Sequence, residues 1–204
     1  GFDEIDWSAY TTARAVTVTN TGTNDGYQGN EISLTAGPPD FDNIEAFIGS
    51  AAAGTDSVNY SALGGPIVVT IGTDVTNFET LTGSAAGADE LVGTNGGDAW
   101  SITGAAAGSL NGTITFTAFE NMTGGTGDDT FAVADTIVVA GGIDGGTAGT
   151  DEIDWSAWAS AKGVTVTGTG TNDGYQGTEA SLTGGFDNIE AFTGSAAAGT
   201  DSIT

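Results

Sequence analysis

The chain has 204 residues, with 35 glycines, no cysteine, no histidine and 27 acidic residues against two basic ones, for a formal net charge of −25. So few lysines and arginines exclude binding to nucleic acid or to anionic lipid through a basic surface. The missing His and Cys exclude zinc sites, cysteine nucleophiles and Ser-His-Asp triads, which leaves a hard cation bound by oxygen as the metal to consider. No apolar run approaches the length of a membrane span, so we expect no membrane insertion.

The first expected elements are short strands. Ile5 and Trp7 alternate with polar residues, and residues 16–19 read Val-Thr-Val-Thr, which is the period of a strand with one buried face. Residues 24–27, Asn-Asp-Gly-Tyr, predict a protruding turn after the second of these strands. A β-branched run at 67–71 predicts another strand.

A turn of the form Gly-x-Asp-x-apolar recurs along the chain, and we expect a strand to start after each one. The turn begins at Gly54, Gly87, Gly96, Gly127, Gly149 and Gly199. Short β-branched strands between Gly, Asn and Asp turns, with almost no helical periodicity, predict an all-β fold. Because the units are short and repeat, a parallel β-solenoid of the β-helix or β-roll type is favoured, and repeated β-sandwiches are the alternative.

Two stretches carry a calcium-binding pattern. Residues 124–132, Gly-Gly-Thr-Gly-Asp-Asp-Thr-Phe-Ala, fit every defined position of the nonapeptide G-G-x-G-x-D-x-U-x. Residues 84–101 contain two such units in succession, the first with Ser84 and Ala85 in place of the glycines. Glycine permits a left-handed turn with exposed carbonyl oxygens, and aspartate adds an anionic oxygen. The alternative is that these turns only cap strands through side-chain hydrogen bonds.

In these residues the chain resembles the repeats-in-toxin family. Over its whole length it resembles, more loosely, the giant Gly/Thr/Asp-rich repetitive surface proteins and adhesins of bacteria. The resemblance implies that Ca²⁺ is bound and that each ion is shared by two successive turns. The candidate metal-binding residues are Gly87, Asp89, Asn95, Gly96, Asp98, Gly124, Gly125, Gly127, Asp128 and Asp129.

A long internal repeat divides the chain. Residues 3–9, Asp-Glu-Ile-Asp-Trp-Ser-Ala, return unchanged at 151–157, and the two cations, Arg14 and Lys162, hold equivalent positions. Residues 1–148 therefore form one long repeat unit of several coils, and residues 149–204 are the start of the next copy. Such an excerpt is typical of a tandem array.

These features predict a non-enzymatic structural or adhesive segment of a secreted bacterial surface protein, forming a Ca²⁺-stabilised β-solenoid rod or filament. The expected location is extracellular, at the cell surface, and the expected partners are further copies of itself and surface glycans. The alternative is a calcium-responsive folding and secretion module, because a charge of −25 opposes folding until cations bind.

A polysaccharide-acting β-helix enzyme is the more distant alternative. Its carboxylates would be Asp3, Glu4 and Asp6 and their copies Asp151, Glu152 and Asp154. Such an enzyme needs cationic groups to hold an anionic substrate, whereas this chain has two, and carboxylates duplicated in this way are more typical of a solvated face. The Thr-x-Thr arrays are expected on polar outer strand faces. The tryptophans are expected in the core, with sugar stacking as their alternative role.

Overall fold

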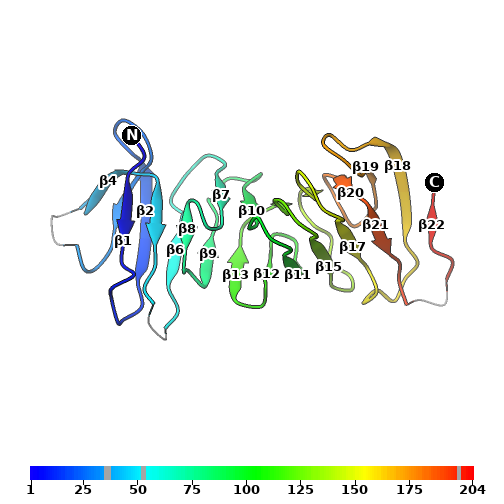
Figure 1. The fold of residues 1–204 in the computed structure, drawn as a ribbon, viewed down its shortest axis with the longest axis horizontal. Coiled ribbons are helices and arrows are strands. Elements are labelled where there is room, and N and C mark those ends of the chain that lie inside the picture. The colour runs from blue at the N-terminus through cyan, green and yellow to red at the C-terminus, as the bar shows by residue number, and fades with distance from the viewer. Residues whose placement is uncertain (35–37, 52–53, 197–198) are drawn as a thin grey trace.

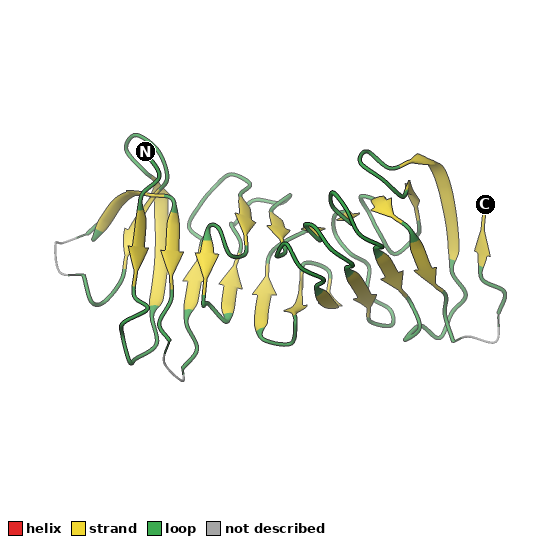
Figure 2. Ribbon diagram, in the orientation of Figure 1, coloured by secondary structure: helices red, strands yellow, loops and turns green. Residues whose placement is uncertain are grey.

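The computed structural model describes residues 1–34, 38–51, 54–196 and 199–204, and these residues form 22 β-strands. The molecule is elongated, and the chain runs from one end to the other, with the N- and C-termini near opposite ends (Figure 1). Figure 2 shows only strands, loops and turns in the described part of the chain. The prediction of an all-β fold is thus confirmed. No described helix is long and apolar enough to cross a bilayer.

The strands form three sheets. The smallest sheet has the order β1 (Glu4–Asp6), β5 (Ala46–Ile48) and β8 (Val75–Thr76). An eight-stranded sheet has the order β22 (Ser202–Ile203), β18 (Gly163–Thr169), β19 (Tyr175–Thr178), β20 (Phe186–Ile189), β16 (Ile143–Asp144), β14 (Asn121–Thr123), β10 (Glu90–Val92) and β7 (Val68–Thr70). An eleven-stranded sheet has the order β21 (Ala191–Thr193), β17 (Glu152–Asp154), β15 (Thr130–Val133), β11 (Ala99–Gly104), β12 (Ala107–Leu110), β13 (Ile114–Thr117), β9 (Thr80–Thr82), β6 (Ser57–Asn59), β2 (Ala15–Thr21), β3 (Tyr27–Asn30) and β4 (Phe41–Ile44).

Most neighbouring strands are parallel and come from segments well apart in the sequence. Thr130 pairs with Glu152, and Glu90 pairs with Asn121, each in a parallel register. Three antiparallel stretches interrupt this pattern, namely β2–β3–β4, β11–β12–β13 and β18–β19–β20. The first and third contain the turn that Asn-Asp-Gly-Tyr predicts, since β2 and β18 each turn back there into an antiparallel neighbour.

The core is a column of apolar side chains that adjacent strands place in register. Trp100 lies beside Phe131, which lies beside Ile153, which in turn lies beside Phe192. The rings of Trp100 and Phe131 stack with centroids 5.5 Å apart. Such stacking of like on like buries apolar area continuously along the molecule and is the main source of its stability.

The predicted alternation of apolar and polar residues is confirmed. In β2 the valines are buried and the threonines between them are exposed, and in β7 Val69 is buried while Val68 is exposed. The Thr-x-Thr segments of β9 and β13 pair side by side, Thr80 with Thr115 and Thr82 with Thr117. Phe116, between the two threonines of β13, is fully buried. All four tryptophans are core residues, at most 8% exposed.

The second copy of the long repeat forms the same strands as the first. Strands β17 to β22 correspond to β1 to β6 and pair among themselves in the same way. The second copy packs directly on the first, because β17 pairs with β15 and β20 pairs with β16. Strands β1 and β4 each have one unpaired edge in the first copy, whereas their counterparts β17 and β20 are paired on both edges.

Candidate functional site

Six turns of one kind, which we call Gly–Asp turns, begin at a glycine and end at an aspartate just before a strand. Their first glycines are Gly49, Gly83, Gly93, Gly124, Gly145 and Gly194, and the aspartates that end them are Asp56, Asp89, Asp98, Asp129, Asp151 and Asp201. In each turn the aspartate folds back over the first glycine, where an added Cβ would lie only 2.1 to 2.7 Å from the carboxylate Oδ2. The first glycine of each turn is therefore required by contact with the aspartate that ends the same turn.

In some Gly–Asp turns the residue after the glycine is Ser or Thr, and the carboxylate is fully hydrogen-bonded. Asp89 accepts the N–H of Ser84 at 2.5 Å, the hydroxyl of Ser84 at 2.9 Å and the N–H of Ile67 at 2.9 Å. Asp98 likewise accepts the N–H and the hydroxyl of Thr94, at 2.6 and 3.0 Å. These two buried carboxylates act as strand caps, which is the alternative role that the sequence suggested.

In two Gly–Asp turns the residue after the glycine is a second glycine, and the carboxylate has fewer donors. Gly125 and Gly146 both have a φ of +114°, a conformation open to glycine. Gly146 donates its N–H to Asp144 at 2.9 Å. Oδ2 of Asp129 and Oδ2 of Asp151 are buried, and no described residue donates a hydrogen bond to either.

The other carboxylate oxygens of these turns form a ladder. Oδ1 of Asp129 accepts the N–H of Asp98 at 2.7 Å, and Oδ1 of Asp151 accepts the N–H of Asp129 at 2.8 Å. Burial raises the pKa of Asp129 to about 6, with further increases from the charges of Asp98 and Asp128. Burial raises the pKa of Asp151 to about 7, and the charges of Asp129 and Glu190 add to the rise. Protonation is therefore more favourable at these two carboxylates than at an ordinary aspartate.

The structure brings most of the predicted metal-binding residues together. The turn that ends at Asp129 lies on the turn that ends at Asp98, and Thr126 donates its hydroxyl to the carbonyl of Asn95 at 3.1 Å. The neighbouring turns hold Asn95, Gly96, Asp98, Gly124, Gly125, Gly127, Asp128 and Asp129. Gly87 and Asp89 lie elsewhere, because the strand after them, β10, belongs to the eight-stranded sheet, whereas β11 and β15 belong to the eleven-stranded one.

The turn at 145–151 is part of this stack; the sequence identified its Gly-x-Asp turn at Gly149 but did not place it among the candidate metal-binding residues. The N–H of Thr147 donates to the carbonyl of Gly125 at 2.9 Å. Gly149 has a φ of +128°, close to the +122° of Gly127, and both are followed two residues later by a buried aspartate. The turn at 145–151 does not fit the nonapeptide pattern, because it has one residue more between its first glycine and its aspartate than the turn at 124–129 has. The consecutive glycines at 145 and 146 were the signal that could have revealed it.

Asp129 and Asp151 fit a hard cation better than Asp89 and Asp98 do. A Cβ on Gly124 would lie 2.1 Å from Oδ2 of Asp129 and 2.4 Å from the carbonyl oxygen of Gly145, so both oxygens lie on the same side of Gly124. Within the described ranges no three His, Cys, Asp or Glu side chains converge on a common point. A cation at this stack would be held by one carboxylate and backbone oxygens, which suits Ca²⁺.

Both basic side chains of the chain are buried in equivalent ion pairs. The guanidinium of Arg14 lies 3.4 Å from Glu31, and the ammonium of Lys162 lies 3.6 Å from Glu179. Burial lowers the pKa of Lys162, and the neighbouring charge of Glu179 opposes that shift. The ammonium also lies 2.9 Å from the ring centroid of Trp158. Each cation neutralises a buried glutamate and is not available to hold an anionic ligand.

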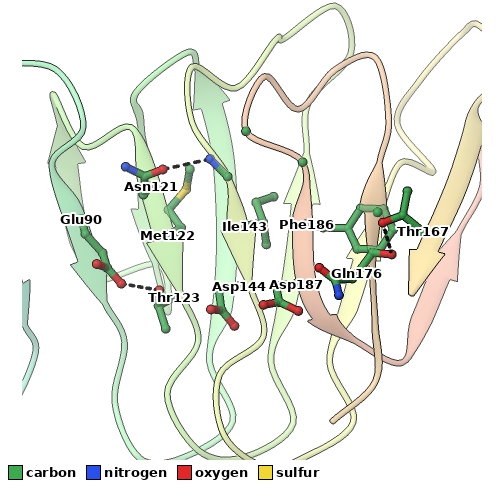
Figure 3. A pocket seen from close by; sticks show the side chains of 14 residues that line it. Glu90, Asn121, Met122, Thr123, Ile143, Asp144, Thr167, Gln176, Phe186 and Asp187 are labelled. Atoms are coloured by element: carbon green, nitrogen blue, oxygen red, sulfur yellow. Dashed lines mark hydrogen bonds between the residues drawn. The ribbon is translucent and has the colours of Figure 1, made fainter. Parts of the chain in front are cut away.

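A groove of about 440 Å³ crosses the outer face of the eight-stranded sheet (Figure 3). Its carboxylates are those of Glu90, Asp144 and Asp187, and the last two belong to paired positions on β16 and β20. Burial raises the pKa of Asp144, whose Oδ1 accepts the side-chain amide of Asn188 at 2.7 Å. Glu90 accepts the hydroxyl of Thr123 at 2.6 Å. The groove is polar and anionic, and sequence reasoning did not single it out.

Three of the carboxylates suggested for glycoside hydrolysis accept hydrogen bonds from backbone N–H groups. Asp6 and Asp154 cap the turns after them, accepting the N–H of Ser8 and of Ser156 at 2.7 Å each. Asp151, in contrast, is buried in the ladder of Gly–Asp turns. Asp151, just before β17, and Asp154, its last residue, therefore have different structural roles. No protein-family model, curated protein sequence or solved structure matches the chain.

Proposed function

We propose that this chain is a non-enzymatic structural or adhesive segment of a secreted bacterial surface protein, built as a β-solenoid rod that associates with further copies. The observation that carries the proposal is the packing of the second copy on the first through β15–β17 and β16–β20. Stacking through parallel strands extends without limit, because each new copy presents the edge that the next one needs.

Assembly is the test of this role. Cryo-electron microscopy and sedimentation of the purified chain over a range of concentrations and salt should show rods or end-to-end oligomers. Isolated monomers at every concentration would contradict the proposal. Copies of the chain are the main partner, and surface glycans are a second one, for which the exposed Tyr175 and the polar groove offer contacts.

The rod is calcium-stabilised through the stacked Gly–Asp turns. The free buried oxygens of Asp129 and Asp151 support this, because an ion that binds only the folded state stabilises it. The two possibilities, a rod stabilised by calcium and a module that folds only with calcium, differ in the metal-free state. Circular dichroism in chelator should keep the β signal in the first case and lose it in the second.

A matched pair of variants locates the ion. Replacing Asp129 and Asp151 by Asn should abolish the rise in melting temperature on adding Ca²⁺. Replacing the hydrogen-bonded Asp89 by Asn should leave that rise intact. Equal responses of both variants would place calcium elsewhere, and no response of the unmodified chain would refute calcium binding.

An enzymatic role is disfavoured by the placement of charge. The groove holds carboxylates, whereas both basic side chains are buried in ion pairs, so an acidic polysaccharide would meet only repulsion there. Release of reducing ends or uronic acid from such a polysaccharide would contradict this view.

A further inference from the structure

Two Asn-Gly pairs occur in the chain, Asn95-Gly96 and Asn111-Gly112. In such a pair the main-chain nitrogen of the glycine can attack the side-chain amide carbon of the asparagine and close a succinimide ring, because glycine has no Cβ to obstruct the approach. In a folded chain the reaction also requires that the asparagine side chain can turn toward that nitrogen. The two pairs differ in this respect.

The side chain of Asn111 is fixed at both of its polar ends. Its Oδ1 accepts the N–H of Ala99 at 2.8 Å, and its Nδ2 donates to Oδ1 of Asp98 at 2.6 Å. Turning this side chain toward Gly112 would break both bonds and would take a donor away from the buried carboxylate of Asp98. The fold therefore protects Asn111 from the reaction.

The side chain of Asn95 has no such restraint. It is exposed in the turn before β11, and no described residue forms a hydrogen bond with its side-chain amide. The main-chain carbonyl of Asn95 accepts the hydroxyl of Thr126 at 3.1 Å, so the backbone is held while the side chain stays free to rotate.

The nitrogen of Gly96 is accessible to that side chain. Gly96 is exposed, and for a Cβ built on it the nearest atom of a described residue beyond its chain neighbours would be Oγ1 of Thr94, at 3.7 Å. The N–H of Gly96 donates to the same oxygen at 3.2 Å. Because an N–H lies in the plane of its peptide group, this bond leaves both faces of the nitrogen open to attack on a carbon.

We propose that Asn95 is a site of spontaneous modification, at which the folded chain converts an asparagine into an acidic residue while Asn111 is preserved. The nitrogen of Gly96 forms a bond to Cγ of Asn95, the bond from Cγ to Nδ2 breaks, and Nδ2 leaves as ammonia with the proton that the Gly96 nitrogen carried. Water then opens the ring. Its addition to Cγ gives aspartate, and its addition to the main-chain carbonyl carbon gives isoaspartate, in which the chain continues through Cγ.

Either product places a new carboxylate at the stacked Gly–Asp turns. In aspartate it is the side chain of residue 95, and in isoaspartate it is the former main-chain carbonyl group, whose oxygen accepts the hydroxyl of Thr126. These turns already hold the carboxylates of Asp98 and Asp129. The added carboxylate should therefore enlarge the stabilisation by Ca²⁺. This consequence rests on the proposed calcium binding, whereas the modification does not.

The test compares the two Asn-Gly pairs in the same molecule. The full chain is incubated at mildly alkaline pH with and without urea, and mass spectrometry follows the loss of ammonia in the peptides that contain residues 95 and 111. In the folded chain Asn95 should react at least about tenfold faster than Asn111, because only its side chain is free to reach the attacking nitrogen. In urea the two rates should become similar, since the fold no longer holds Asn111.

Two alanine variants complete the test. Gly96→Ala should slow the reaction at Asn95, because the Cβ hinders the attack, and the open space and the absence of a positive φ at Gly96 allow the turn to fold. Gly87→Ala, in equally open surroundings, should leave the rate unchanged. Equal rates at Asn95 and Asn111 in the folded chain, or a rate at Asn95 that Gly96→Ala does not lower, overturns the proposal.

The consequence for calcium is measured separately. Asn95→Asp reproduces one product, and it should increase the rise in melting temperature on adding Ca²⁺. An unchanged rise would refute the link to calcium, and the mass-spectrometric result would still decide the modification.

Discussion

Replacing Asp151 by Asn should make the metal-free protein more stable at pH 8, although it removes a fully buried native side chain. Oδ1 of Asp151 accepts the N–H of Asp129, and an amide oxygen can take over that bond. Oδ2 has no donor, and its charge is disfavoured by burial and by the charges of Asp129 and Glu190. The amide therefore keeps the one bond and removes the buried charge.

The magnitude follows from the pKa. An aspartate has a pKa of about 3.9 when unfolded, whereas that of Asp151 in the folded chain is about 7. The folded state therefore holds the proton more tightly, so this stabilisation is complete below about pH 4 and is lost as the pH rises through about 7. Ionisation at pH 8 costs up to about 4 kcal/mol, and we expect Asp151→Asn to recover about 2 to 4 kcal/mol there and almost nothing at pH 4.

Urea unfolding in chelator at pH 8 and pH 4 measures this effect. Asp89→Asn is the matched control, because both oxygens of Asp89 accept N–H or O–H donors. An amide group cannot accept them all, and we expect a loss of about 1 to 3 kcal/mol at pH 8. If Asp151→Asn were as destabilising as Asp89→Asn at pH 8, the account of a free carboxylate oxygen would be wrong.

Two further substitutions test the packing of the turns and the buried ion pairs. Gly124→Ala should destabilise the fold by about 1 to 3 kcal/mol or more, because its Cβ would meet Oδ2 of Asp129. Gly87→Ala should be nearly neutral, because its Cβ would meet nothing within 4 Å. Thermal unfolding of the two variants measures the difference, and equal effects would contradict the contact at Gly124. Lys162→Met alone should lower the free energy of unfolding by about 3 to 5 kcal/mol, because it leaves Glu179 buried without its partner. Adding Glu179→Leu should restore part of that loss, as measured by urea unfolding. A double variant less stable than Lys162→Met alone would refute the pairing.

The strands were predictable because their signal is local. Alternation in residues 16–19 specifies which side chains face inward, and the β-branched run at 67–71 predicts a strand; the structure agrees with both. The pairing was less accessible. Strands β11, β12 and β13 form an antiparallel meander within the parallel arrangement, and nothing in the local pattern distinguishes such a stretch from three separate coils.

Only the residues of the candidate site were predictable from the sequence, because the hydrogen bonds of each carboxylate depend on its neighbours. The glycines and aspartate of 124–132 are visible in the sequence, but whether an aspartate caps a turn or keeps a free oxygen depends on one neighbour. Where Thr94 follows the glycine, its N–H and hydroxyl bond the carboxylate. Where Gly125 follows the glycine, it has a positive φ, and no described residue donates a hydrogen bond to Oδ2 of Asp129. Adjacent units in sequence, such as those of Asp89 and Asp98, lead into different sheets, because stacked turns come from more distant segments.

The positions of the two basic side chains leave the negative charge of the surface without basic neighbours. Arg14 and Lys162 are the only basic side chains, and each is at most 7% exposed. Each neutralises a buried glutamate, and the backbone N–H of each also bonds the aspartate of a Gly–Asp turn. No basic side chain therefore remains on the outer surface. A partner of this surface must then be neutral, bring cations with it, or bind through apolar contacts, because a second anionic surface would be repelled.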